Sequence, residues 1–518
     1  MFNSFIKSQL IQLPLLPEFI ILGTALGILL YGSILNFVKH EKCLVRQFTV
    51  ISVIALVIAN LFIFVSLDLG ADLYYNDSLV FDFGTQFTKF ILITVGIVCL
   101  LMVRPSLKIN QLVCYEYFIL SLFAIMGGMI FVSCADLMYM YIALELQSFC
   151  LYTLVALNHR TTLVGSEAGI KYFILGVASS IFLLISALYF YITLVTCNLN
   201  NISAYFCVKL PGLVASSTQF SGFGTFLHVM NVFEFKIVIA IFCFFIALFF
   251  KLTLVPFHMW VPDVYEGAPL PVVIFISTIP KITVIFILLR VTSDYFKDVY
   301  YLWQPLFILV GLSSVIVGIL NAVRQFNMKR FIAYSSIAHM GYIILAMSGC
   351  SYISSKVCIY YFFIYLVTIL TFWSIFLCVE TKYGRSFTSW LDWGGIFNNC
   401  IVLRSHLVIV LLSLGGLPPV ASFYAKVLLF KGLLSSSMYV IALLLLIFSL
   451  LSVFYYIRII KVVLFDSKSK FPIVRREIDF ISALIGSILP LLLLFFFYFD
   501  FLNEIIELYA SSLYFPNK

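Results

Sequence analysis

Five ionisable residues of this 518-residue chain lie within or beside long apolar segments, where burying an ionisable side chain costs free energy. They are Glu145 in MYIALELQSFC, Lys171 in SEAGIKYFILG, and the lysines Lys251, Lys281 and Lys426. A lysine at the centre of a membrane helix costs about 2.5–3.5 kcal/mol on insertion scales. A buried lysine can exchange a proton near neutral pH, whereas an arginine keeps its proton. These residue types therefore indicate ion or proton handling.

Helix-breaking residues accompany the lysines. The stretch from Lys251 to Lys281 contains Pro256, Pro262, Pro269 and Pro271, and GGLPP at 415–419 precedes Lys426. Proline inside a helix frees a backbone carbonyl, and such carbonyls line water-filled cavities in transporters with discontinuous helices. The sequence therefore predicts broken helices at both places.

Composition sets the class of protein. The chain is 63% hydrophobic and 10% charged, with a mean hydropathy of +1.13. A soluble chain of this length would need charged surfaces for several domains. The sequence contains no C-x-x-C, no G-x-G-x-x-G and no Walker loop, so it gives little support to iron–sulfur, zinc, disulfide or nucleotide sites. The prediction is an all-α polytopic membrane protein.

A membrane span needs about 20 apolar residues. Because lipid offers the backbone no hydrogen-bond partners, such spans are expected to be helices. The apolar runs predict about fourteen transmembrane helices, at 15–38, 48–67, 86–103, 115–134, 136–157, 168–195, 232–254, 271–294, 301–322, 329–349, 357–379, 401–432, 437–464 and 479–502. The separation of the fourth from the fifth is inferred from Asp136. Helices 7 and 12 of this series are the broken ones, and their spacing of five helices fits an internal repeat.

The predicted organisation is a single membrane domain with four parts. They are an N-terminal three-helix segment, two five-helix repeats, and a C-terminal helix with a tail, at 1–110, 115–294, 301–465 and 466–518. Basic residues concentrate in loops after odd-numbered helices, which places those loops on the cytoplasm- or matrix-like side and both termini opposite. The loop after the second helix is acidic. The longest polar gap, 196–231, is expected to be a surface loop with a short interfacial element.

Each of these residues also has a purely structural interpretation, and its strength differs between sites. Lys171 and Lys426 lie near expected helix ends, where a lysine can snorkel to the interface. His339, in AYSSIAHMGY, is equally a candidate relay and a helix-packing histidine. Glu145 and Lys281 are embedded too deeply in apolar sequence for easy snorkelling, so a functional role suits them better than an interfacial one.

Several stretches resemble a known family. They are KLTLVPFHMWVPDVYEGAPLPV at 251–272, KRFIAYSSIAHMGYI at 329–343, SLGGLPPVASFYAKVLLF at 413–430 and YYIRIIKVVLF at 455–465, with ELQSFCLYTLVAL and SEAGIKYFILG upstream. Together they resemble the antiporter-like membrane subunits of respiratory complex I (NADH:ubiquinone oxidoreductase) that are called chain 2, or chain N in bacteria. The similarity runs from the fourth to the thirteenth predicted helix.

The resemblance implies an antiporter-like fold with inverted five-helix repeats at helices four to eight and nine to thirteen. It implies no cofactor bound by this chain, since NADH, FMN, iron–sulfur clusters and ubiquinone belong to partner subunits. Its key glutamate maps to Glu145 and its lysines to Lys171, Lys251, Lys281 and Lys426. In that scheme Glu145 senses the neighbouring subunit and pairs with Lys251, Lys281 is the central relay, and Lys426 passes the proton outward. Pro280 departs from the family, which more often has a small residue before the lysine.

The expected function is therefore proton translocation by a core membrane-arm subunit, driven by NADH oxidation and ubiquinone reduction in partner subunits. The alternatives are a cation/proton antiporter subunit and a scaffold of the arm that translocates nothing. Expected partners are the adjacent antiporter-like subunits and membrane lipids, with no nucleic acid. The 55 phenylalanines and 30 tyrosines suggest an A/T-rich organellar genome, which favours the mitochondrial inner membrane over a bacterial plasma membrane.

Overall fold

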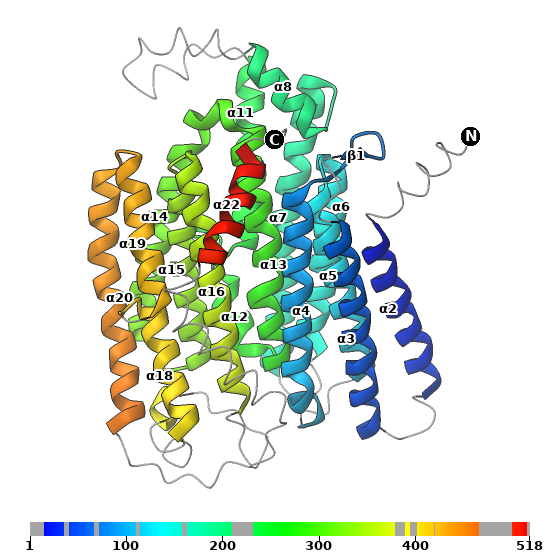
Figure 1. Cartoon of the computed structure of the whole chain (residues 1–518), viewed down its shortest axis with the longest axis vertical. Coiled ribbons are helices and arrows are strands. Elements are labelled where there is room, and N and C mark those ends of the chain that lie inside the picture. The colour runs from blue at the N-terminus through cyan, green and yellow to red at the C-terminus, as the bar shows by residue number, and fades with distance from the viewer. Residues whose placement is uncertain are drawn as a thin grey trace.

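The chain forms a bundle of long helices, shown from the front in Figure 1. The computed structural model describes residues 15–35, 41–66, 72–109, 114–157, 163–209, 232–378, 389–393, 401–418, 420–465 and 500–514. Ten helices in these ranges are long and apolar enough to cross a membrane. The expected membrane protein built mainly of helices is thus confirmed.

The N-terminal segment contains three long helices and one small ribbon. The helices are α2 (Leu16–Leu35), α3 (Glu41–Ser66) and α4 (Phe83–Ile109). Between α3 and α4, strands β1 (Asp72–Tyr74) and β2 (Leu79–Phe81) pair antiparallel, around a turn whose residues 75–77 all have positive φ. The acidic loop that follows the second helix thus closes on itself as a hairpin.

The next group of helices contains the first helix break. It consists of α5 (Cys114–Ser133), α6 (Leu137–Ala156), α7 (Leu163–Leu194), α11 (Val232–Lys251), α12 (Trp260–Gly267) and α13 (Leu270–Arg290). The Asp136 carboxylate caps α6 by accepting a hydrogen bond from the Met138 backbone N–H at 2.8 Å. The separation of two helices at Asp136 is confirmed. Eight residues that belong to neither α11 nor α12 follow Lys251, around Pro256.

The second group contains a similar interruption. It consists of α14 (Tyr300–Arg324), α15 (Met328–Met347), α16 (Tyr352–Cys378), α18 (Ile401–Gly415), α19 (Ala421–Ser435) and α20 (Tyr439–Phe465). Helix α18 ends at the GGLPP sequence, and Gly416 just beyond it has a φ of +72°. The left-handed backbone there suits glycine, which has no Cβ to clash. The inverted-repeat relation between the two groups stays a prediction.

The count of fourteen spans also stays a prediction. Helices α11 and α15 occupy the seventh and tenth predicted spans but are not among these ten helices. The twelfth predicted span is divided between α18 and α19, which have 15 residues each. The fourteenth, 479–502, lies almost wholly outside the described residues.

Helix α13 occupies the centre of the bundle. All of its residues are buried, whereas only 28% of the α20 span and 39% of the α3 span are buried. The outer helices α3 and α20 therefore offer their apolar side chains to lipid. The amphipathic helix α22 (Asp500–Tyr514), red in Figure 1, contacts α4 and α16, and its Tyr509 packs against Phe286 of α13 with ring centroids 5.3 Å apart.

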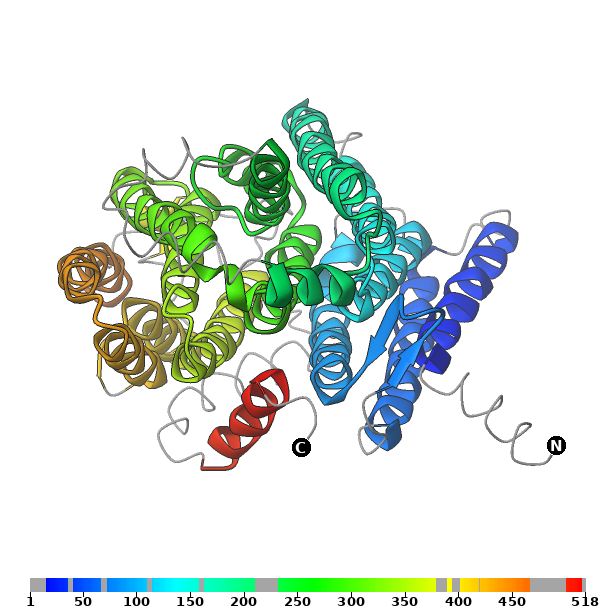
Figure 2. The ribbon, with the colours of Figure 1, turned by 90° about the horizontal axis from the view of Figure 1, so that it is seen from above.

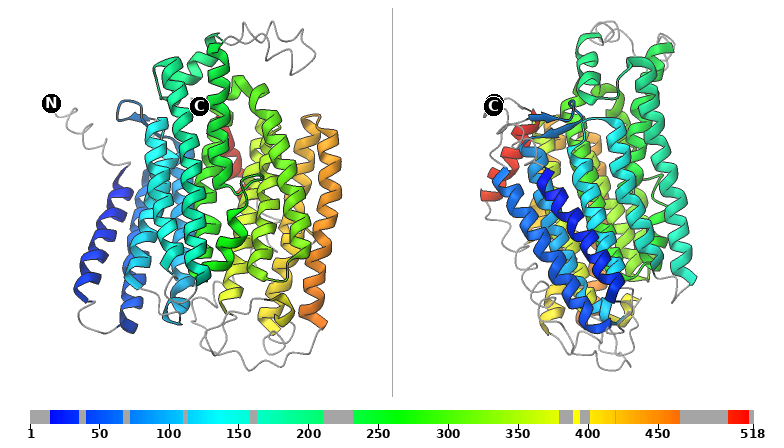
Figure 3. Two further views of the ribbon diagram at one scale, coloured as in Figure 1. Left: turned by 180° about the vertical axis from the view of Figure 1, so that it is seen from behind. Right: turned by 90° about the vertical axis from the view of Figure 1, so that its right-hand side faces the viewer.

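One end of the bundle carries a transverse helix. In the view of Figure 2, α8 (Leu199–Lys209) lies across this end, which also carries the β1–β2 ribbon, and Figure 3 shows the same end from two sides. The short element expected within 196–231 corresponds to α8. The rest of that stretch, 210–231, lies outside the described residues.

A thiol on α8 gives a test of topology. Cys207 is exposed, and its Sγ donates to Asp298 Oδ2 at 2.9 Å. That hydrogen bond holds the pKa of the Cys207 thiol above its ordinary value. We expect an impermeant maleimide to label Cys207 from the positive side, slowly near neutral pH and faster as rising pH produces thiolate. Asp298→Asn lowers the thiol pKa and should accelerate labelling at a fixed pH.

Cys43 is the matching thiol: the sequence predicts it in the basic loop on the opposite side, and the structure places it in the first turn of α3. Its side chain lies outside the described set. In sealed vesicles of known orientation, Cys207 and Cys43 should be labelled from opposite sides. Labelling of both from one side would contradict the predicted alternation of loops.

Candidate functional site

Three of the five predicted ionisable residues are lysines buried inside the bundle. Lys281 is 1% exposed, Lys251 7% and Lys426 8%. A buried ammonium group is tolerated only with hydrogen-bond partners, and each of these has one. Lys251 Nζ donates to the Tyr152 hydroxyl at 3.1 Å, Lys281 Nζ to the Tyr365 hydroxyl at 3.1 Å, and Lys426 Nζ to the Gly415 carbonyl at 2.7 Å.

Lys281 lies midway along α13, directly after Pro280. The helix continues through the proline from residue 270 to residue 290, although Pro280 cannot donate the backbone hydrogen bond of its position. The lysine reaches α16, where its Nζ contacts Tyr365 and lies 5.4 Å from the centroid of that ring. This contact orients the Lys281 side chain toward α16.

His339 on α15 lies near tyrosines that contact two of the buried lysines, Lys281 and Lys426. Its Nδ1 is 2.9 Å from the Tyr361 hydroxyl, and its ring centroid is 5.4 Å from that of Tyr365. The Tyr342 ring centroid is 6.3 Å from that of His339, and Lys426 Nζ lies 5.7 Å from the Tyr342 centroid. The imidazole is therefore near both Tyr365, the partner of Lys281, and Tyr342, the neighbour of Lys426.

The interruption between α18 and α19 shapes the Lys426 site. Since α18 ends at Gly415, the carbonyl of Gly415 is available to accept from Lys426. The lysine side chain runs across Gly416, where an added Cβ would come within 2.6 Å of Lys426 Cδ and Cε. A residue larger than glycine at 416 would therefore displace the lysine.

Glu145 does not contact the lysine with which it was expected to pair. Among the described residues no ion pair joins Glu145 to Lys251, whose ammonium group bonds Tyr152 instead. Glu145 is half-buried on α6, and the Ser148 hydroxyl lies 3.2 Å from its Oε2. Glu145, Ser148 and Tyr152 are spaced three and four residues apart, which places them along one side of α6. In place of a direct ion pair, Glu145 accepts from Ser148 and Lys251 donates to Tyr152, and both of these partners lie along this side of α6.

Lys171 belongs to a different environment from the three buried lysines. Its side chain is 42% exposed, and its Nζ lies 2.7 Å from Glu167 and 2.9 Å from Asp263. Arg330 of α15 also contacts Asp263, at 3.3 Å, and forms an ion pair with Glu266. These charges connect α7, α12 and α15 around the first helix break. Exposed pairs of this kind contribute about 0–1 kcal/mol each, so the cluster positions α12 more than it stabilises the fold.

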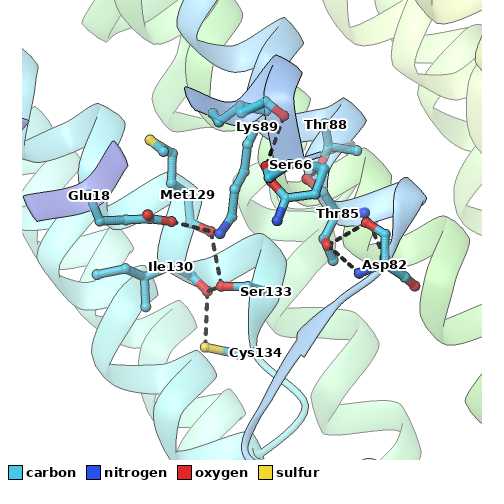
Figure 4. Close-up of polar contacts among 12 residues, drawn as sticks. Glu18, Ser66, Asp82, Thr85, Thr88, Lys89, Met129, Ile130, Ser133 and Cys134 are labelled. Atoms are coloured by element: carbon cyan, nitrogen blue, oxygen red, sulfur yellow. Dashed lines mark hydrogen bonds and ion pairs between the residues drawn. The ribbon is translucent and has the colours of Figure 1, made fainter. Parts of the chain in front are cut away.

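The sequence reasoning missed a buried ion pair. Lys89 of α4 and Glu18 of α2 lie 2.6 Å apart, with side chains 0% and 6% exposed, and Figure 4 shows them meeting between helices. The Lys89 ammonium group also lies 4.4 Å from the centroid of the Phe81 ring. Both residues stand near the start of a predicted helix and look like interfacial residues by position. Their opposite charges in two apolar segments were the signal available in the sequence.

Within the ranges that the structure describes, no group of three or more His, Cys, Asp and Glu residues is placed to hold a metal ion. What the arrangement offers instead is a series of ammonium, hydroxyl and imidazole groups inside an apolar bundle, the chemistry of proton exchange.

Known proteins resemble the chain over nearly its whole length. Subunit N of NADH-quinone oxidoreductase from Pelagibacter ubique is 35% identical over 95% of this chain and 97% of its own. The subunit N from Maricaulis maris is 33% identical over 91% of each chain, and chain 2 of NADH-ubiquinone oxidoreductase from Marchantia polymorpha is 31% identical over 94% of this chain and 95% of its own.

Solved structures share the fold. A chain of respiratory complex I from Thermus thermophilus matches with a TM-score of 0.73 and 24% identity, over 96% of this chain and 99% of the other. A chain of the Mrp complex from Dietzia sp. DQ12-45-1b matches with a TM-score of 0.77 and 17% identity, over 97% and 98%. The family model described as NADH:quinone oxidoreductase/Mrp antiporter, TM, matches residues 134–452. These matches confirm the resemblance found in the sequence, and the chain belongs to the NADH:quinone oxidoreductase/Mrp antiporter family of transmembrane proteins.

Proposed function

We propose that this chain is a membrane-arm subunit of respiratory complex I and translocates protons through its buried lysines. The observation that carries the proposal is a spatial series of neighbouring polar groups. It runs from Lys281 through Tyr365 and His339 to Tyr342 and Lys426. The family membership and the relatives named subunit N and chain 2 support the same assignment.

The chemistry asked of these groups is proton exchange without electron transfer. Lys281 donates a proton through the Tyr365 hydroxyl toward His339, and Lys426 receives it beyond Tyr342, with ordered water completing the steps that side chains do not reach. Moving one proton against a potential of about 180 mV costs about 4 kcal/mol. That energy comes from NADH oxidation and quinone reduction in partner subunits, which carry the FMN, iron–sulfur and quinone chemistry.

Lys171 enters the proposal with a role of its own. Its ion pairs with Glu167 and Asp263 tie it to α12, beside the first helix break. We assign it to the entrance of the route, where an exposed lysine can collect protons from solvent. Glu145 acts at the face of α6 that a neighbouring subunit covers.

A second candidate function is cation/proton antiport, because the Mrp complex of Dietzia contains a chain of the same fold. Proteoliposomes with this chain alone would then take up sodium against a proton gradient. A scaffold without translocation is the third, and it requires normal pumping after the loss of Lys281. We place the chain in the mitochondrial inner membrane, with a bacterial plasma membrane as the alternative, beside adjacent antiporter-like subunits and lipid.

Glu145→Gln tests the link to the partner subunits. The substitution keeps the shape and the contact with Ser148 but removes the negative charge that favours a protonated lysine nearby. We expect assembled complex whose proton uptake per NADH oxidised falls several-fold. Equal proton uptake per NADH in the variant and the parent, measured with a pH indicator in sealed membranes, would remove Glu145 from the mechanism.

A further inference from the structure

A tryptophan on the segment between α16 and α18 lies against the turn that joins α14 to α15. Trp390 begins the short helical turn η6 (Trp390–Asp392) and is 4% exposed. Its backbone N–H donates to the Phe326 carbonyl at 3.2 Å, and its indole Nε1 donates to the Gln325 carbonyl at 3.1 Å. The Trp390 and Phe326 rings also stack, with centroids 6.1 Å apart. Two hydrogen bonds and a stacked ring therefore fix the position of this turn.

The next residues of the chain hold the first helix break. Asn327 Nδ2 donates to Glu266 Oε1 of α12 at 2.8 Å, and Arg330 forms an ion pair with Glu266. Lys329 Nζ donates to the carbonyl of Ala268, just beyond the end of α12, at 2.8 Å. Helix α12 has 8 residues, and isolated helices shorter than about 12 residues are marginal in water. The position of α12 therefore depends on contacts of this kind.

A cation connects the tryptophan to the outer helix α20. The Arg458 guanidinium carbon lies 5.0 Å from the centroid of the Trp390 ring, which is within the range of a cation–π contact. Helix α20 packs on α18 and α19, the two helices of the second interruption. Trp390 thus connects the surroundings of the second interruption to the turn that holds the first.

A second tryptophan on the same segment has a different set of contacts. Trp393 is 1% exposed, and its ring centroid lies 6.2 Å from that of Phe372 and 5.4 Å from that of Phe376. Both phenylalanines belong to α16, so Trp393 fastens the segment to that helix. Trp390 contacts the α14–α15 turn and α20 instead, and its contacts lead on to α12.

We infer that Trp390 is a positioning residue for α12. It holds the α14–α15 turn in place, and Asn327 passes that position to Glu266. Helix α12 is thereby kept beside Lys171, whose Nζ pairs with Asp263 of the same helix. The inference rests on the proposed function, in which Lys171 lies at the entrance of the proton route. It deepens that function by placing a residue of the second group of helices in control of the first break.

The first measurement is hydrogen–deuterium exchange of the α12 backbone in the assembled complex. Trp390→Leu removes the indole donor, the stacked ring and the cation–π contact, so we expect the amides of 260–267 to exchange several-fold faster than in the parent. Trp393→Leu is the matched control, because it removes a buried tryptophan from the same segment and leaves the contacts of the turn in place. Its α12 amides should stay within about twofold of the parent.

Proton uptake coupled to NADH oxidation is measured on the same variants. We expect Trp390→Leu to lose several-fold, because α12 no longer holds its place beside Lys171, and Trp393→Leu to keep the parental value. Trp390→Phe retains an aromatic ring for Phe326 and Arg458 while it loses the indole donor. It should restore most of the uptake and most of the slow exchange in α12.

Asn327→Ser tests the same connection without changing the tryptophan. Serine keeps the cap of α15, in which the side-chain oxygen of residue 327 accepts from the Lys329 backbone N–H, but it loses the amide that donates to Glu266. We expect the same faster exchange and the same loss of uptake as with Trp390→Leu. The double variant should be no worse than either single one, because both changes break one connection. If Trp390→Leu does not assemble, Asn327→Ser decides the question.

Parental exchange in α12, or parental proton uptake, in assembled Trp390→Leu would overturn the inference. Equal effects of Trp393→Leu and Trp390→Leu on α12 would overturn it as well. The proposed function is decided separately, by Lys281→Met. If Lys281→Met abolishes uptake while Trp390→Leu keeps it, only the positioning role is wrong. If Lys281→Met pumps like the parent, the translocation proposal fails, and the exchange of α12 still decides whether Trp390 positions that helix.

Discussion

Lys281→Arg should abolish proton translocation although it keeps the positive charge. Lys281 is 1% exposed and bonds a single hydroxyl, that of Tyr365. A relay must release its proton and take it back, and arginine does not release its proton at accessible pH. We expect coupled proton uptake to fall by about 10²-fold or more, measured with quinone-dependent NADH oxidation in membranes that hold equal amounts of assembled complex.

Lys281→Met separates a relay from a structural charge. Methionine has no proton to give, so a relay fails with it as with arginine. A structural lysine gives another ranking, in which arginine is tolerated and methionine is harmless or stabilising, since burying a charge is costly. Lys356→Met is the control: Lys356 forms a partly exposed ion pair with Glu507 and lies outside the series of buried lysines, so activity should persist. Full activity of the arginine variant would exclude the relay.

Lys89→Met should be among the most destabilising substitutions in the N-terminal segment. It leaves the Glu18 carboxylate, 6% exposed, without its partner inside an apolar bundle. Removing one member of a buried ion pair typically costs about 3–5 kcal/mol. We expect a lower thermal unfolding midpoint of the purified protein and a smaller yield of assembled complex.

The double variant Glu18→Gln with Lys89→Met distinguishes the ion pair from simple packing. Removing both charges eliminates the unpaired carboxylate, so most of the lost stability should return. Two losses that simply add would show that the two side chains do not act as a pair. Proton translocation should remain in the double variant, because neither residue belongs to the series of buried lysines around Lys281.

The sequence was most informative where a local rule decides the structure. Apolar runs of about 20 residues correspond to long helices, since lipid offers the backbone no partners. Asp136 marked the start of α6, because an aspartate accepts from the first free N–H groups of a helix. The burial of Lys281 followed from uniformly apolar neighbours on both sides, and α13 is buried along its whole length.

What the sequence could not supply was the partner of each buried group. Lys251 bonds Tyr152, 99 positions earlier, and Lys281 bonds Tyr365, 84 positions later. Such choices depend on how helices are arranged in three dimensions, which no periodicity records. The same holds for Glu18 and Lys89, 71 residues apart. The sequence did not predict the β1–β2 ribbon, because two three-residue strands are too short to show an alternating pattern.

The position of α22 bears on which parts of the bundle can move around Lys281. Helix α13 is covered on every side, and Tyr509 of α22 closes on it at Phe286 while Lys356 and Glu507 fasten α22 to α16. Close-packed interiors resist sliding, so we expect the α13 backbone to stay in place during turnover. Its backbone amides should then be among the slowest in the chain to exchange with deuterium. Under the proposed function, the parts that change position around α13 are protons, hydroxyl hydrogens and the ends of lysine side chains.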